Sequence, residues 1–224
     1  MVSLIIPTLN EAQNIALVLS QIKNEVVTEI IVVDGGSSDE TVAIAEAGGA
    51  RVIIEPRRGY GLACDTGVKN AAEEIVVFLD ADGANDPAQV MDLITPITRG
   101  EADMVLGSRL SGNIAPGAMP WHQHFGNLLS ARLITWLYGL PITDLGPFRA
   151  VERQKLLSLD LQDMTYGYPT EMIVKAARRG WRIKELPVDY YPRSGGKSKI
   201  SGTIRGTFLA TTHILSTIFR YVKY

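Results

Sequence analysis

The sequence predicts an α/β fold in which helices cover both faces of a largely parallel sheet. Two observations carry this prediction. Short, continuously apolar runs alternate with segments of helical periodicity through the first half of the chain, and strands of that kind are typical of parallel sheets buried on both sides. Polar and glycine-rich residues follow each apolar run, and in an open α/β sheet such positions share the carboxyl edge, where ligands bind.

The predicted elements follow one another in a regular order. Strands are expected at Ser3–Pro7, Ile30–Val33, Arg51–Ile54, Ile75–Leu79, Met104–Gly107 and Trp181–Val188. Helices are expected at Glu11–Lys23, Asp39–Ala47, Gly61–Ala72, from Asp86-Pro87 onward, and at Gln123–Tyr138, Thr170–Arg179 and Thr203–Lys223, where apolar residues recur at helical spacing. Turn formers in Thr143–Ala150 and the basic, glycine-rich stretch Pro192–Gly202 predict loops.

Composition and charge bound the class of protein. Hydrophobic residues make up 46% of the 224 residues and charged residues 21%, as in an ordinary globular enzyme. A net charge of -2 gives no global attraction for nucleic acid, so no nucleic-acid partner is expected. The single cysteine, Cys64, excludes an intrachain disulfide and is interpreted as a small, half-buried filler. With neither a signal peptide nor a spanning segment, a cytoplasmic protein is expected, at most peripheral on the membrane.

The triplet Asp80-Ala81-Asp82 directly follows a predicted apolar strand. Two carboxylates one residue apart at a strand end can face a common point, and hard oxygen ligands of this kind suit Mg²⁺ or Mn²⁺ bridging a diphosphate. Such a metal neutralises the charge that develops on a nucleoside-diphosphate leaving group. A solvated turn is the simpler alternative, because aspartate is common in turns.

A second polar segment, Val32–Thr41, follows another predicted strand. Asp34 ends that strand, where its carboxylate can accept hydrogen bonds from a nucleobase or ribose, and the glycines after it allow close approach of ligand and backbone. Ser38 or Asp39 is expected to cap the helix that comes next.

These segments occur with others in a characteristic order. The full set is Ile5–Glu11 (IIPTLNE), Val32–Thr41 (VVDGGSSDET), Arg58–Gly61 (RGYG), Phe78–Gly83 (FLDADG), Gly107–Arg109 (GSR), Thr143-Asp144, Glu185–Val188 (ELPV) and Gly195–Gly202 (GGKSKISG). The chain thereby resembles a family 2 glycosyltransferase, and most closely the dolichol-phosphate (polyprenyl-phosphate) mannosyl- and glucosyltransferase branch. The resemblance covers about residues 1–202, and the combination is far more specific than any one motif.

The resemblance implies a GT-A fold with a mostly parallel central sheet and assigns roles to residues. It implies one domain over 1–202, with a nucleotide-sugar-binding half at 1–110 and an acceptor half at 111–202, followed by an amphipathic helix at 203–224. The expected nucleotide-sugar contacts are Pro7, Asn10, Glu11, Asp34, Gly59, Gly61, Asp80, Asp82, Lys197 and Lys199. The expected metal ligands, for Mg²⁺ or Mn²⁺, are Asp80 and Asp82, and the expected catalytic residues are Asp82, Arg109, Asp144 and Arg193.

The implied reaction is an inverting transfer of a hexose from a GDP-mannose or UDP-glucose type of donor, with a polyprenyl or dolichyl phosphate as the favoured acceptor. A lipid phosphate is already anionic, whereas a hydroxyl acceptor, the alternative, needs a carboxylate to take its proton, and Asp144 is the first candidate. A non-catalytic nucleotide-sugar-binding module is the alternative from another class. The intact acidic pair and basic loop favour the enzyme.

Two departures from the family pattern leave details open. Gly83-Ala84-Asn85 follows the acidic triplet where the family commonly has a Leu/Met-Gln pair, so no third protein ligand for the metal is assigned. Gly146–Arg149 differs from the usual mannosyl pattern and leaves the sugar unassigned. For the C-terminal helix, core packing or self-association into a homo-oligomer is favoured over contact with a bilayer.

Overall fold

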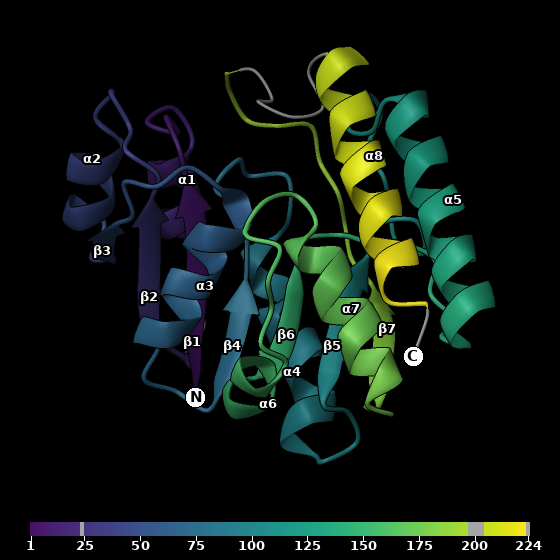
Figure 1. Ribbon diagram of the computed structural model, residues 1–224. Helices are drawn as coiled ribbons and strands as arrows, with labels where there is room; N and C mark the ends of the chain where they lie inside the picture. Colours follow the sequence, from purple (N-terminus) through teal and green to yellow (C-terminus); the bar gives the residue numbers. More distant parts are fainter. Residues whose placement is uncertain (23–24, 197–203, 223–224) are drawn as a thin grey trace.

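The structure, a computed structural model, describes residues 1–22, 25–196 and 204–222, with the backbone alone over 204–210. A seven-stranded sheet forms its centre, with the strand order β3-β2-β1-β4-β6-β5-β7 (Figure 1). The strands are β1 (Val2–Thr8), β2 (Val27–Asp34), β3 (Arg51–Ile54), β4 (Ile75–Phe78), β5 (Met104–Ser108), β6 (Arg149–Glu152) and β7 (Ile183–Pro187). The predicted α/β sheet covered on both faces is confirmed.

Helices cover both faces of the sheet. They are α1 (Ile15–Gln21), α2 (Thr41–Ala47), α3 (Tyr60–Asn70), the short 3-10 helix η1 (Pro87–Gln89), α4 (Val90–Thr98), α5 (Trp121–Tyr138), α6 (Arg153–Ser158), α7 (Tyr168–Arg178) and α8 (Ile204–Arg220). In Figure 1, α3, α6 and α7 lie in front of the sheet, and α5 and α8 stand side by side at one end. Helices α1, α2 and α4 lie on the opposite face.

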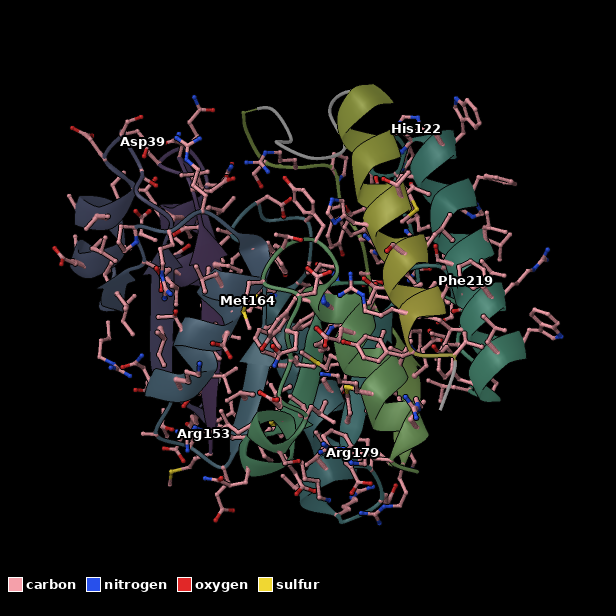
Figure 2. The ribbon with its side chains drawn as sticks, in the orientation of Figure 1. Asp39, His122, Arg153, Met164, Arg179 and Phe219 are labelled. Atoms are coloured by element: carbon pink, nitrogen blue, oxygen red, sulfur yellow. The ribbon has the colours of Figure 1, made fainter. Side chains whose placement is uncertain are left out.

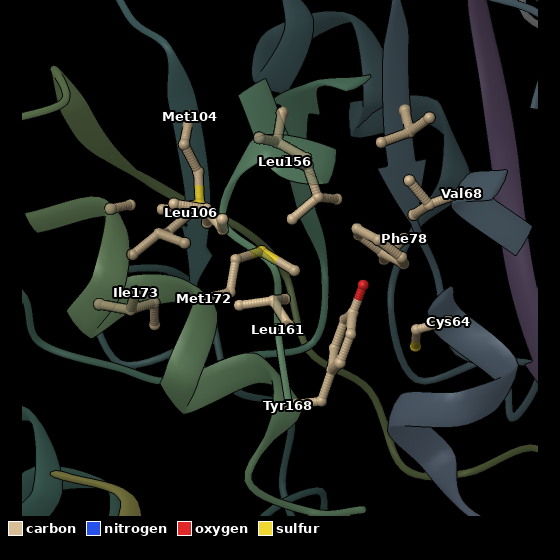
Figure 3. Close-up of a cluster of buried hydrophobic side chains, with 14 of the residues drawn as sticks. Cys64, Val68, Phe78, Met104, Leu106, Leu156, Leu161, Tyr168, Met172 and Ile173 are labelled. Carbon is tan, nitrogen blue, oxygen red and sulfur yellow. The ribbon is translucent and has the colours of Figure 1, made fainter. Parts of the chain in front are cut away.

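The two faces hold separate apolar cores because strand side chains alternate in direction. In β1, Ile5 packs into one core, while Leu4 and Ile6 pack into the other. Figure 3 shows the first core, where Cys64 and Tyr168 lie beside the end of β4. Cys64 is buried there, and burial raises the pKa of its thiol, so it is the apolar filler that the sequence predicted, although fully rather than half buried.

All six predicted strands are present, but β6 and α6 were not predicted from the sequence. Strand β6 has only four residues, Arg149–Glu152, and follows a segment of turn formers. It lies between β4 and β5 and is antiparallel to both. Such a short strand shows little periodicity in its sequence. It is stabilised by pairing with a strand on each side rather than by a pattern of its own residues.

The direction of the strands places the loops. Strands β1, β2, β3 and β4 are mutually parallel, and β5 and β7 run in the same direction because β6 is antiparallel to β4 and β5. The segments that follow β1, β2, β4, β5 and β7 therefore meet at one edge of the sheet, the upper edge in Figure 1. The segment before β6, which contains Asp144, also lies at this edge because β6 starts there.

The C-terminal helix α8 packs on the body of the protein. Ile218 is fully buried in the first core, Thr217 is buried, and the Tyr138 hydroxyl of α5 donates to the Ile218 carbonyl at 2.5 Å. The expected core packing of this helix is therefore confirmed for its second half. In the described parts of the chain, no helix has the length and apolarity needed to cross a membrane.

Candidate active site

The two carboxylates of the acidic triplet lie at the end of β4, at the carboxyl edge. The Tyr60 hydroxyl at the start of α3 donates to Asp80 Oδ1 at 3.1 Å, and the Ala84 amide donates to Asp82 Oδ1 at 3.0 Å. Gly83, between Asp82 and Ala84, has φ +73°, a left-handed conformation that glycine adopts without strain. Burial, followed by the Asp82 charge, raises the pKa of Asp80 to about 7, and burial also raises the pKa of Asp82.

Arg193 joins this pair to the loop after β1. Its guanidinium lies 3.4 Å from Asp82 Oδ2 and donates to the buried Glu11 carboxylate through its other terminal nitrogen. Its Nε donates to the Gly195 carbonyl at 2.7 Å. The neighbouring Ser194 amide donates to the Asp82 carbonyl at 3.1 Å, so the segment after β7 is fastened across the edge of the sheet.

The acidic pair fits a divalent cation. Both side chains offer carboxylate oxygens, the ligands that Mg²⁺ and Mn²⁺ prefer. The raised pKa values indicate that the protein alone does not balance their negative charge. Within the described residues, no group of three or more His, Cys, Asp or Glu side chains is suited to hold a metal. Among the residues that the structure describes, Asp80 and Asp82 are therefore the candidate ligands, and diphosphate and water would have to complete the coordination.

Asp34 is used inside the protein. Its carboxylate accepts from the Gly36 amide at 2.9 Å and the Ser37 amide at 2.7 Å, from the Ser37 hydroxyl, and from the Thr8 hydroxyl at 3.4 Å. A carboxylate has about four acceptor sites, so these donors occupy them. These hydrogen bonds shape the loop after β2, and the contact of Asp34 with a nucleobase or ribose stays a prediction.

The loops after β1 and β2 are fastened to each other near the same place. Asn10 has φ 51°, and its side-chain oxygen accepts from the Ser38 backbone amide at 2.8 Å. The Asn10 backbone amide donates to the Ser37 hydroxyl at 2.7 Å. Asp39 accepts from the Thr41 amide at 3.1 Å. The N-cap of α2 is Glu40, however, and no side chain caps the helix, so the predicted capping by Ser38 or Asp39 is wrong. Figure 2 shows Asp39 at the upper edge, opposite Arg153 and Arg179.

Pro7, near the end of β1, and the two glycines of the RGYG segment, at the start of α3, lie at the same edge of the sheet. Pro7 is half-buried in β1. A Cβ on Gly59 would lie 2.3 Å from the Met164 carbonyl oxygen, and one on Gly61 would lie 2.7 Å from the Asp163 carbonyl oxygen. The glycines thus admit the backbone of residues 163–165, which accepts hydrogen bonds from the first amides of α3. The expected contact of Gly59 and Gly61 with the nucleotide sugar stays a prediction.

Arg109 and Asp144 form a buried ion pair at the same edge. Arg109 Nε donates to Asp144 Oδ2 at 2.7 Å, its terminal nitrogen donates to Oδ1 at 2.8 Å, and its backbone amide donates to Oδ2 at 2.9 Å. The Leu145 amide completes the set at 2.8 Å. Burial by itself raises the pKa of Asp144, but the Arg109 charge and these hydrogen bonds outweigh it and lower the pKa below its usual value.

This geometry argues against Asp144 as a proton acceptor. A general base needs an open acceptor atom and a pKa near the working pH, whereas every oxygen of Asp144 is used and its pKa is lowered. Asp144 instead holds the Arg109 guanidinium in place, 5.0 Å from the centre of the Tyr190 ring. Asp144 is a positioning residue in this arrangement.

Sequence analysis missed three side chains that shape the site. Tyr60 donates to Asp80, Tyr190 stacks on Arg109, and the Glu185 carboxylate accepts from the Thr143 and Asp144 amides at 2.9 and 3.1 Å. Tyr60 and Glu185 stand inside quoted family segments, which was the available signal, and Tyr190 had none. The expected contacts Lys197 and Lys199 lie outside the described residues.

The comparisons with known proteins agree with this architecture. Residues 3–159 match the family model for glycosyl transferase family 2. The chain is 39% identical over 209 residues to an uncharacterized glycosyltransferase of Mycobacterium tuberculosis, spanning 93% of this chain and 94% of that one. It is 34% identical over 206 residues to glycosyltransferase AglJ of Haloferax volcanii, spanning 91% and 67%.

A solved structure has a similar fold. This is glucosyl-3-phosphoglycerate synthase from Mycobacterium tuberculosis in complex with Mn²⁺, uridine diphosphate and glucosyl-3-phosphoglycerate. The TM-score is 0.80, the sequence identity is 24%, and the match covers 99% of this chain and 80% of the other. At that identity the likeness concerns the fold alone.

Proposed function

The chain belongs to glycosyl transferase family 2, and we propose that it moves a hexose from a nucleotide sugar to a polyprenyl or dolichyl phosphate with inversion at the anomeric carbon. The donor is of the UDP-glucose or GDP-mannose type, and the reaction uses Mg²⁺ or Mn²⁺. We propose the cytoplasmic face of a membrane as its place. Residues 1–110 then bind the donor, 111–202 bind the acceptor, and 203–224 complete the fold.

The observation that carries the proposal is the pair of unbalanced carboxylates at the end of β4, with Arg193 beside it. A divalent ion held by Asp80 and Asp82 supplies charge neutralisation to the departing diphosphate. Arg193, 3.4 Å from Asp82 Oδ2, adds a fixed positive charge at the same point. Glu11 holds the other side of that guanidinium and fixes its orientation. Lys197 and Lys199 are proposed to extend this positive charge toward the donor or acceptor phosphates.

The state of Asp144 supports a phosphate acceptor. A hydroxyl must lose a proton as it attacks, and the carboxylate proposed for that task is locked to Arg109. A phosphate oxygen is anionic at neutral pH and attacks without a base. The buried, charged Arg109 that Asp144 orients is suited to meet such a phosphate or the sugar that it attacks.

A second candidate is transfer to a hydroxyl of a small phosphorylated acid. The solved structure of similar fold contains glucosyl-3-phosphoglycerate with Mn²⁺ and uridine diphosphate. Another structure of the same enzyme contains UDP-glucose and phosphoglyceric acid with Mn²⁺. Mn²⁺ and a uridine donor, which that enzyme binds, are therefore the first pair to test with the present chain.

The test is a two-stage measurement on the full chain. UDP- and GDP-sugars are first screened by thermal shift with and without Mn²⁺, and the best donor is then offered a short-chain polyprenyl phosphate or 3-phosphoglycerate. We expect metal-dependent stabilisation and transfer to the polyprenyl phosphate. Transfer to phosphoglycerate alone would select the second candidate. Binding without transfer to either acceptor and without donor hydrolysis would support the non-catalytic alternative.

A further inference from the structure

Helix α5 presents a row of large apolar side chains to solvent. Trp121 is 80% exposed, Phe125 61%, Leu129 39% and Trp136 78%. With an aromatic side chain offering about 200 Å², the three rings leave roughly 400 Å² of aromatic surface uncovered. That area matches the largest apolar patches of typical monomers, which often mark interaction sites.

These residues share one face of the helix. Steps of three or four residues return to the same side of an α-helix, and with Arg132 the series 121, 125, 129, 132 and 136 follows those steps throughout. The buried residues of α5 are Ser130, Ala131 and Ile134, which face the core. We call the exposed set Trp121, Phe125, Leu129, Arg132 and Trp136 the α5 stripe.

The charge of this part of the molecule is of one sign. Neither α5 nor α8 contains an acidic residue, while Arg132 and Arg220 are basic and exposed. Arg132 lies within the stripe, so whatever covers the stripe must also accept a positive charge. Tryptophan and arginine both combine an apolar body with a polar end, the property that suits them to a membrane interface.

A second copy of the chain fits the stripe poorly. In a two-fold contact between α5 helices, the same patch meets itself, and Arg132 near the middle would approach its own counterpart. The absence of acidic residues in α5 and α8 leaves no carboxylate on these helices to balance the two charges. Burying them without a partner is costly. An anionic lipid headgroup supplies the missing negative charge.

The stripe is also tied to the candidate active site. The segment that leads into α5 is fastened to Tyr190, because the Ala115 amide donates to the Tyr190 carbonyl at 2.9 Å. The Tyr190 ring lies over Arg109. Figure 2 shows His122, in the first turn of α5, at the same upper edge as Asp39. One end of the stripe thus lies on the side of the molecule where the sheet presents the site.

We propose that the α5 stripe docks on an anionic phospholipid surface, with the two tryptophans at headgroup level and Arg132 against lipid phosphates. This deepens the proposed function, because a polyprenyl phosphate lies in such a surface. It places the membrane contact on α5, whereas the membrane alternative weighed from the sequence used the C-terminal helix, whose described second half packs inward.

The experiment measures sedimentation of the full chain with vesicles that contain no acceptor, so its outcome is independent of sugar transfer. The vesicles are phosphatidylcholine alone or an equal mixture with phosphatidylglycerol. We expect the unchanged protein to bind to the mixture. The triple variant Trp121→Ala, Phe125→Ala, Trp136→Ala should bind at least about tenfold more weakly. Arg132→Gln should weaken binding to the mixture by about fivefold and leave phosphatidylcholine alone unaffected.

The matched control replaces exposed apolar residues elsewhere, as Leu17→Ala, Ile54→Ala, Met91→Ala, which are 44%, 54% and 41% exposed. It should bind vesicles like the unchanged protein. Thermal unfolding of each variant checks that the fold is kept. Equal binding by the stripe variant and the unchanged protein would overturn the proposal. So would a dimer in sedimentation equilibrium that the stripe variant dissociates, which would assign the stripe to a second copy.

Discussion

Two carboxylate sites lie at the same edge of the sheet and differ in how their charge is balanced. Asp144 is wholly buried and holds four donors, including both arms of Arg109. Asp80 is only partly exposed and has one described donor, the Tyr60 hydroxyl, with the Asp82 carboxylate close by. The pKa of Asp144 is lowered, and that of Asp80 is raised to about 7.

The difference separates structure from ligand binding. A carboxylate whose charge the protein already balances is part of the architecture, whereas a half-buried pair that lacks a full counter-charge is suited to bind a cation. Aspartates at strand ends look alike in the sequence. Their partners in the fold are what distinguish them.

The largest expected effect is the loss of the balanced pair. Asp144→Ala should lower the free energy of unfolding by about 3 to 5 kcal/mol, because it leaves the Arg109 guanidinium buried without a counter-charge. Urea denaturation measures this. Replacing both partners, as Asp144→Leu with Arg109→Met, should recover part of the loss. Transfer to phosphate and hydroxyl acceptors should fall together, and a selective loss with hydroxyl acceptors would restore Asp144 as a base.

Removal of one carboxylate of the acidic pair should affect transfer strongly and stability little. Asp82→Asn should reduce transfer by about a hundredfold or more, since a metal ligand is lost, while the stability of the metal-free protein should stay equal or rise. Transfer assays with varied Mn²⁺ and urea denaturation in a chelator measure the two quantities. Asp86→Asn, at the start of η1, is the control in the same loop and should retain activity. Unchanged metal dependence in Asp82→Asn would show that the pair is not the metal site.

The link from α3 to the acidic pair should have a smaller effect. Tyr60→Phe removes the hydroxyl that donates to Asp80. It should reduce transfer by about tenfold, mainly because Mn²⁺ binds more weakly. Stability should change by about 1 kcal/mol or less. Tyr166→Phe, on an exposed tyrosine, is the control. A loss of stability larger than the loss of metal affinity would make Tyr60 a packing residue only.

The two sites should also give opposite pH dependences of stability in metal-free protein. Because the folded pKa of Asp144 is lowered, its contribution is present above about pH 4 and is lost as the pH falls further. Because the folded pKa of Asp80 is raised, its contribution is present below about pH 4 and declines as the pH rises toward about 7. Urea denaturation across this range should show Asp80→Asn flattening the decline, and saturating Mn²⁺ should do the same. An unchanged profile in Asp80→Asn would contradict this assignment.

The sequence predicted the sheet and most of its helices because continuous apolar runs such as β1 and amphipathic segments such as α7 follow local rules. It also located the edge on which the site lies, since polar residues follow each parallel strand. It missed β6, which is too short to carry a pattern and is held by its neighbours on both sides. It also could not show why Gly59 and Gly61 are glycines, because the backbone that packs against them comes from a loop about a hundred residues further along.

The sequence by itself determined the family, the fold class and the acidic pair at the end of β4, because each depends on residue type and order along the chain. The tertiary structure decided which charges are balanced. Arg109 meets Asp144, and Arg193 meets Glu11 and Asp82, only because an antiparallel strand brings the segment before β6 to the edge and the segment after β7 crosses it. Charge balance depends on distances between residues far apart in the chain, and folding alone sets those distances.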